Sequence, residues 1–146
     1  MTLLEFTLSA MLALNPGRYH APLAIAIAAA VEGAPAIFRD DADKRRTAAL
    51  MVAVAFRESS FMVNAIGDNG HAVCAFQIYD GPKSLLTDTD ACAREGLRML
   101  RESAKVDPAN PVAFYARGPR YRSDKAQSIS RDRMNLAKWA KAKVER

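Results

Sequence analysis

The chain has 146 residues, half of them apolar and a quarter charged, with a formal net charge of +5. That length corresponds to one ordinary domain, and the balance of apolar and charged residues excludes a disordered chain. No apolar run reaches the roughly 18 residues needed to span a bilayer. The two cysteines, Cys74 and Cys92, are too few for a disulfide framework or a four-cysteine zinc site.

Two helices are predicted at the N-terminus, over residues 3–14 and 21–32. The first ends at the Asn-Pro-Gly sequence of residues 15–17, and the second ends at Gly33. Helical spacing places one set of apolar side chains of the first helix on a shared face: Leu4, Leu8, Met11 and Leu12. We expect residues 1–36 to form a helical extension packed on the remainder of the domain.

The next predicted helix, over roughly residues 43–58, is the most apolar in the chain. Asp40, Asp41 and Asp43 are candidate N-caps for it. Its residues 48–56 are apolar on every face, and a helix that is apolar all round is normally a buried central one.

Glycine and asparagine residues interrupt the helical pattern over residues 59–81. A helix capped by Asp88 or Thr89 is then predicted over 90–104, a short one near 110–117 and a long basic one near 124–143. Residues 74–79 are the only short β-like run. The sequence therefore predicts an all-α fold, with at most a minimal β-like segment, around a buried central helix.

The positive charge is concentrated at the C-terminus. Residues 117–146 hold ten Lys and Arg against three Asp and Glu, a net +7, whereas residues 1–116 carry −2. The basic helix within 120–146 is therefore expected to attract polyanions such as an anionic cell wall, although it can also be a solvated amphipathic helix. It contains no zinc-finger or RNA-recognition signature, so specific nucleic-acid binding is not expected.

Glu58 lies at the end of the apolar helix, where a carboxyl group loses hydration and its neutral form is favoured. A raised pKa is what a general acid needs at neutral pH. The alternative is a surface carboxylate paired with Arg57 or another arginine.

Two further segments carry polar groups among apolar ones. A loop with two glycines and an asparagine leads into an apolar run that contains Gln77, whose amide either binds a polar ligand or caps nearby backbone. Downstream, Tyr115 in the sequence Phe-Tyr-Ala-Arg-Gly of residues 114–118 combines an apolar ring with a hydroxyl group.

Together, Glu58-Ser59, the loop ending in Phe76-Gln77-Ile78 and the Phe-Tyr segment resemble the lysozyme-like soluble lytic transglycosylases, including phage endolysins and virion-associated muralytic proteins. The family pattern is Glu-Ser, a Gly-rich loop ending in Gly-Leu-Met-Gln-Ile, and then Ala-Tyr-Asn-x-Gly. The resemblance covers roughly residues 43–140 with the order preserved. It implies a single lysozyme-like domain over residues 1–146 that cleaves peptidoglycan.

The resemblance also implies a role for each matching residue. Glu58 would be the only catalytic carboxyl, first acid and then base, in cleavage between N-acetylmuramic acid and N-acetylglucosamine to give an anhydro sugar. Ser59 would orient Glu58 or the substrate acetamido group, and Tyr115 would position the Glu58 carboxyl. Gln77 would hydrogen-bond the saccharide, and Phe76 would stack on a sugar face. No cofactor is implied.

The sequence departs from the family pattern at Cys74, which replaces a glycine, and at Ala116, which replaces an asparagine. These departures favour an alternative: a lysozyme-fold adaptor of a phage tail or secretion machine, with weak or no activity. A hydrolase is another alternative, and its second carboxylate would be Asp68 or Asp80. Cys74 can pair with Cys92 in a disulfide outside the cell, or both can remain buried thiols.

We expect action at the bacterial cell wall or periplasm. The apolar stretch of residues 23–31 resembles the apolar region of a signal peptide, but Arg18 is the only basic residue before it. Since a signal peptide begins with a positively charged segment, we do not expect one here. Delivery by lysis, by a virion or by a secretion machine is therefore expected. His20 and His71 are far apart in the sequence and lack companion ligands at metal spacing, so no metal site is predicted.

Overall fold

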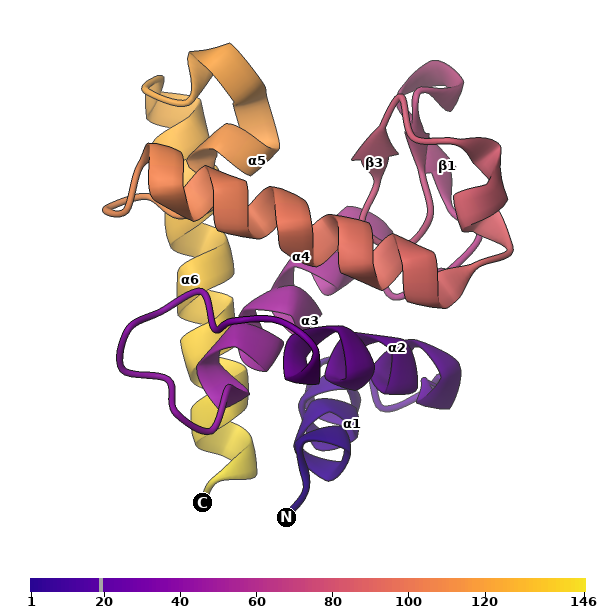
Figure 1. The fold of residues 1–146 in the computed structure, drawn as a ribbon, viewed down its shortest axis with the longest axis vertical. Helices are drawn as coiled ribbons and strands as arrows, with labels where there is room; N and C mark the ends of the chain where they lie inside the picture. Colours follow the sequence, from indigo (N-terminus) through magenta and orange to yellow (C-terminus); the bar gives the residue numbers. More distant parts are fainter. Residues whose placement is uncertain (19) are drawn as a thin grey trace.

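The computed structural model describes residues 1–18 and 20–146, and within them the chain is mainly helical (Figure 1). The elements, in chain order, are α1 (Leu3–Leu14), α2 (Ala21–Glu32), α3 (Arg45–Ser59), β1 (Ile66–Gly67), β2 (Ala72–Val73), β3 (Ile78–Tyr79), α4 (Thr89–Val106), α5 (Ala113–Arg117) and α6 (Asp124–Val144). Along the same residues, no helix combines the length and apolar character needed to cross a membrane.

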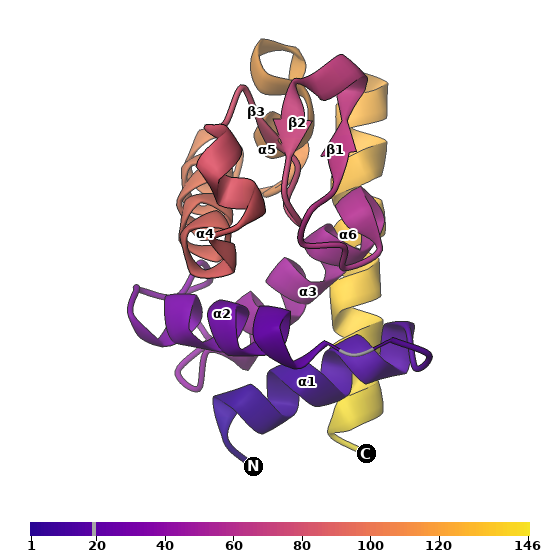
Figure 2. The same ribbon diagram turned by 90° about the vertical axis from the view of Figure 1, so that its right-hand side faces the viewer.

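Helix α3 lies at the centre of the molecule, as the sequence predicts. Every residue from Thr47 to Ala55 is buried, and α3 packs against α1, α2 and α6 (Figures 1 and 2). Alanines at positions 48, 49, 53 and 55 keep the helix narrow, so that neighbouring helices approach it on several sides. The end of this helix is thereby held in place by most of the fold.

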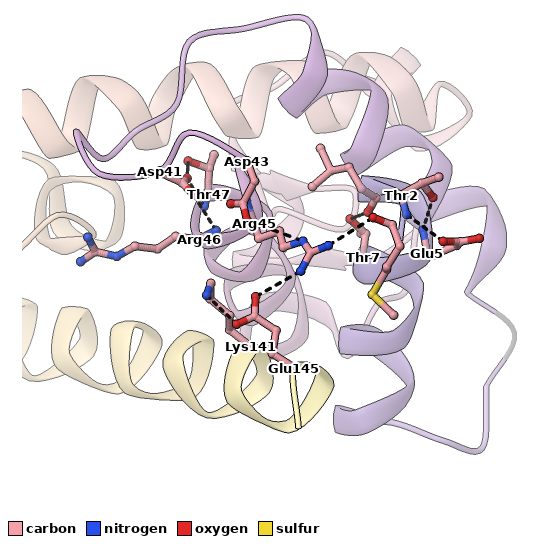
Figure 3. Close-up of polar contacts among 12 residues, drawn as sticks. Thr2, Glu5, Thr7, Asp41, Asp43, Arg45, Arg46, Thr47, Lys141 and Glu145 are labelled. Carbon is pink, nitrogen blue, oxygen red and sulfur yellow. Dashed lines mark hydrogen bonds and ion pairs between the residues drawn. The ribbon is translucent and has the colours of Figure 1, made fainter.

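The start of α3 is built by a network of aspartates around Lys44, the N-cap, which has a left-handed backbone with φ 62°. The buried Asp41 carboxylate accepts hydrogen bonds from the backbone N–H groups of Arg46 and Thr47 and from the Thr47 hydroxyl (Figure 3). Asp43 accepts from the N–H of Arg45. Two of the three predicted aspartates thus satisfy the free N–H groups, and the helix begins two residues later than predicted.

Helices α1 and α2 have the predicted bounds, but the predicted apolar face of α1 is confirmed only in part: Met11 is buried, and Leu8 packs half-buried against the core. Leu4 and Leu12 are 38% and 41% exposed, whereas the buried residues of α1 are Phe6, Thr7, Ala10 and Met11. Helix α1 is apolar around most of its circumference, so periodicity alone does not select the buried face. The small side chains at positions 7 and 10 let α1 lie close to α2 and α3. This N-terminal segment shares one apolar core with α3.

Three short antiparallel strands, in the order β1-β2-β3, follow α3. Ile66 pairs with Val73, and Val73 with Ile78. The predicted β-like run over 74–79 is correct only for its last two residues, because 74–77 form a turn between β2 and β3. Strands of two residues are too short to show alternation in the sequence.

The remaining helices agree with prediction to within three residues at either end. Asp88 caps α4, accepting from the N–H of Ala91, and Ser123 caps α6, accepting from the N–H of Ala126. The short helix α5 lies against both α4 and α6, and its position matters for the candidate site.

Candidate active site at the end of helix α3

Glu58 is the penultimate residue of α3, and 26% of its side chain is exposed. Burial raises the pKa of this carboxyl above its ordinary value, and the positive charge of Arg133 opposes that rise. Since burial is the larger effect, the neutral acid is favoured relative to a solvated glutamate. Glu58 is therefore a partly buried acid that is still open to solvent.

The positive charge beside Glu58 comes from α6. An Arg133 guanidinium nitrogen, Nη2, lies 3.9 Å from Oε1 of Glu58, and Nη1 of the same side chain donates to Asp132 at 2.7 Å. Arg57 pairs with Asp132 through two hydrogen bonds of 3.0 and 3.2 Å. Arg57 is therefore not the partner of Glu58. Within the described part of the chain, Nε of Arg133 is buried without a hydrogen-bond partner.

Sequence reasoning missed this pair of α6 residues. Asp132 and Arg133 stand about 75 positions from Glu58, in a helix that the sequence predicts as a basic face for polyanions or for solvent. The one available signal was Asp132, an aspartate between two arginines in the sequence. Such an aspartate favours a positively charged neighbour, but the sequence does not identify which one.

Ser59 connects the end of α3 to the turn after β2. Its hydroxyl group lies 2.7 Å from the carbonyl oxygen of Ala75 and 3.0 Å from that of Ala55, to either of which it donates. The predicted contact of Ser59 with Glu58 is absent from the described hydrogen bonds. Ser59 instead sets the position of the turn relative to the helix that carries Glu58.

Tyr115 reaches the same turn from α5, and its hydroxyl donates to the carbonyl oxygen of Phe76. The described hydrogen bonds include none from Tyr115 to the Glu58 carboxyl, so any positioning of Glu58 by Tyr115 acts through the turn. Burial raises the pKa of Tyr115 well above its usual value, and the negative charges of Glu58 and Glu95 add to that rise. The phenol therefore remains a protonated donor at all physiological pH values.

Two buried serines hold α5 in place. Ser103 of α4 accepts from the backbone N–H of Tyr115, and Ser130 of α6 accepts from the N–H of Val112. The sequence showed no signal for either bond, since each joins positions at least 12 residues apart.

Phe76 is fully buried, so the prediction that it stacks on a sugar face is wrong. Its ring packs against Gly96 of α4 so closely that a Cβ added there would lie 2.7 Å from Phe76 Cγ. The absence of a side chain at position 96 makes the space for this ring, a fit between segments that the sequence did not reveal.

Gln77 braces the turn from inside. Its amide nitrogen donates to the carbonyl oxygens of Cys74 and Ala65, at 3.0 and 3.3 Å. Both of its hydrogens are therefore directed to backbone, as in the capping alternative. Cys74 has a positive φ of 66°, a backbone conformation that favours glycine, at the position where the resemblance implies one. Cys74 is bonded to Cys92 of α4, which joins the turn to the helical core.

The two candidate second carboxylates lie in the strand segment. Asp68 and Asp80 are exposed, and Asp80 pairs with Nδ1 of His71 at 3.0 Å. Beside Asp80, a hollow of about 670 Å³ lies between the end of β3 and α4, lined in part by Tyr79, Asp80 and Glu95. Glu58 is not among its lining residues. Across residues 1–18 and 20–146, no group of three His, Cys, Asp or Glu side chains is placed to hold a metal ion.

Comparison of this chain with models of protein families, with characterised proteins and with solved structures finds no match. The function is therefore inferred from the geometry around Glu58 and from the sequence motifs.

Proposed function

We propose that this protein cleaves the glycan strand of peptidoglycan between N-acetylmuramic acid and N-acetylglucosamine by lytic transglycosylation, with Glu58 as its single catalytic carboxyl. The observation that supports this most is the position of Glu58: a partly exposed acid at the end of the buried helix α3, with its pKa raised by burial. The three sequence motifs that resemble the lytic transglycosylases supply the substrate class.

The proposed reaction needs one group that first gives and then takes a proton. The Glu58 carboxyl protonates the glycosidic oxygen as the bond from that oxygen to muramic C1 breaks. The resulting carboxylate removes the proton of the muramic 6-hydroxyl, whose oxygen bonds to C1 and closes the anhydro ring. Glu58 ends protonated, and no water is consumed.

Arg133 has a consistent place in this cycle. At 3.9 Å from Glu58, its positive charge stabilises the carboxylate that exists between the two proton transfers. Burial favours the acid before the first transfer. The two opposing effects thus act on the two forms that the cycle uses: burial favours the neutral acid, and Arg133 favours the carboxylate.

Ser59, Gln77 and Tyr115 act on the turn after β2 in this proposal. Ser59 ties its backbone to α3 and Tyr115 ties it to α5, whereas Gln77 bonds backbone oxygens of Cys74 and Ala65 within the strand segment. We therefore assign all three residues to positioning. The protein would act at the bacterial cell wall, delivered by lysis, a virion or a secretion machine.

The test is mass spectrometry of the products released from purified peptidoglycan by the wild type and by Glu58→Gln. The amide has the shape of the neutral acid, so the variant should fold while releasing no anhydro-muropeptides. Glu102→Gln is the matched control and should retain activity. Glu102 is an exposed residue of α4, and Lys105 is its one salt-bridge partner within residues 1–18 and 20–146.

Other products would overturn parts of the proposal. Reducing-end muropeptides would identify a hydrolase and direct attention to Asp68 and Asp80, tested by Asp→Asn substitution at each. Full activity of Glu58→Gln would reject Glu58 as the acid. No product from several wall types would favour the adaptor alternative.

A further inference from the structure

A second feature, separate from Glu58, is a set of three adjoining hollows around Phe38 and Arg46. The largest, of about 530 Å³, is lined by the loop between α2 and α3, by the first turn of α3 and by α4. Two smaller ones, of about 260 and 450 Å³, continue from it along α6. Phe38 and Arg46 line all three. Figures 1 and 2 both show this loop directly below α4.

Positive charges line these hollows almost without compensation. The largest receives Arg39, Arg46, Arg101 and Lys105, with Asp40 as its one carboxylate. The smaller two add the cationic side chains Arg131, Lys138 and Lys141. Seven cations from the loop and from three helices thus surround one continuous surface, which we call the Phe38–Arg46 surface.

Few of these cations are neutralised within the protein. Among the salt bridges of residues 1–18 and 20–146, Lys105 pairs with Glu102 at 3.9 Å and Lys141 with Glu145 at 2.8 Å. No salt bridge of those residues involves Arg39, Arg46 or Arg101. Concave surfaces lined by one sign of charge concentrate ions of the opposite sign.

Arg46 is the donor of the surface that stacks on an aromatic ring. Its guanidinium carbon lies 3.9 Å from the centre of the Phe38 ring, and Figure 3 shows its side chain directed away from the carboxylates of Asp41 and Asp43. An arginine held by stacking loses less freedom when its planar edge binds a phosphate in two-pronged fashion. This geometry favours phosphate over a diffuse counterion.

We infer that the Phe38–Arg46 surface binds a flexible, base-free phosphodiester polymer of the polyol-phosphate type found in anionic cell walls. A flexible chain can follow the three hollows in turn, whereas a flat membrane contacts only their rims. Single-stranded nucleic acid needs open aromatic faces for its bases. Among residues 1–18 and 20–146, Phe38 is the one aromatic side chain lining these hollows, and Arg46 covers its ring.

The test measures binding of soluble poly(glycerol phosphate) to the full chain by calorimetry at several salt concentrations. The variant Arg39→Gln/Lys105→Gln removes two exposed cations of the surface. The control Lys83→Gln/Lys143→Gln removes two exposed cations elsewhere, so both double variants have the same net charge. Thermal melts establish that each remains folded.

The surface variant is expected to bind the polymer at least about tenfold more weakly than the wild type. The slope of log K against log salt concentration should decrease in magnitude by about one for each phosphate group that the protein no longer binds. The control should bind within about threefold of the wild type, a change ascribed to net charge alone. Glu58→Gln should bind like the wild type, because Glu58 lines none of the three hollows. Binding and cleavage therefore succeed or fail separately.

Three results would overturn the inference. Equal losses in the two double variants would mean attraction by net charge alone. An oligothymidylate of equal charge that binds as tightly as the polymer, with the same sensitivity to Arg39→Gln/Lys105→Gln, would mean a nucleic-acid surface. Binding to phosphatidylglycerol vesicles without binding to the soluble polymer would mean a membrane surface.

Discussion

Substitution of Gly96 by alanine tests how the turn beside Glu58 is held against α4. Without a side chain at position 96, the Phe76 ring lies directly on the α4 backbone. An added Cβ would lie 2.7, 3.0 and 3.1 Å from three atoms of Phe76. Ordinary carbon contacts are about 3.5–4.0 Å, so the overlap is close to 1 Å. Phe76 is fully buried and has no solvent-facing space to move into.

Two opposing effects set the magnitude. Overpacking of a well-packed core costs about 1–3 kcal/mol, whereas Gly→Ala in a helix interior gains up to about 1 kcal/mol through helix propensity. Three close contacts with a buried ring place the cost in the upper part of its range. We therefore expect a net loss of about 1–2 kcal/mol, which lowers the Tm by about 2–8 °C in a domain of this size.

The measurement is thermal and urea unfolding of Gly96→Ala, of Phe76→Leu and of the double variant. In the Phe76→Leu background the added methyl group meets a smaller side chain, so the cost of Gly96→Ala should shrink and the double-mutant cycle should give a coupling of about 0.5 kcal/mol or more. A Tm that rises in Gly96→Ala, with no coupling to Phe76→Leu, would refute the close packing of Phe76 on α4.

Three further outcomes are expected. Arg133→Met should move the alkaline limb of the pH–rate profile of peptidoglycan cleavage to higher pH. Cleavage needs protonated Glu58, and the positive charge of Arg133 lowers the Glu58 pKa, so removing that charge raises it. An unmoved limb would contradict the contact between Arg133 and Glu58. Replacing both Cys74 and Cys92, 18 positions apart, by serine should cost about 3 kcal/mol in urea unfolding, since the closed loop no longer restricts the unfolded chain; an unchanged midpoint would mean that the thiols are not bonded. Leu50→Ala should cost about 2–5 kcal/mol because Leu50 is buried, and an unmoved melting curve would contradict the central position of α3.

The helices could be predicted because their signals are local. Helix α4 begins at its cap Asp88, α2 ends at Gly33, and α1 ends at the Asn-Pro-Gly sequence of residues 15–17. Each of these signals acts within a few residues of the helix end. The apolar circumference of α3 likewise required burial wherever the helix was placed. The face of α1 could not be predicted in the same way, because the choice between Leu4 and Phe6 depends on which neighbours the helix meets.

In the candidate site, too, only the residue with a local signal could be predicted from the sequence. Glu58 could be selected from sequence, since a carboxyl group at the end of an apolar helix has an unusual solvation whatever surrounds it. Its neighbours could not. Phe76 and Tyr115 were selected by motif, but their side chains contact Gly96 and the turn backbone rather than open space or Glu58.

By itself, the sequence determined the helical character of the chain, the buried central helix and the acid at its end, because these follow from periodicity, capping and local polarity. Only the tertiary structure decided that Arg133 lies beside Glu58, that Cys74 is bonded to Cys92 and that cations of the α2–α3 loop, α4 and α6 converge on Phe38. Each of these joins residues distant along the chain. Their proximity depends on how the helices pack, and helix packing depends on the fit of many side chains at once rather than on any local pattern.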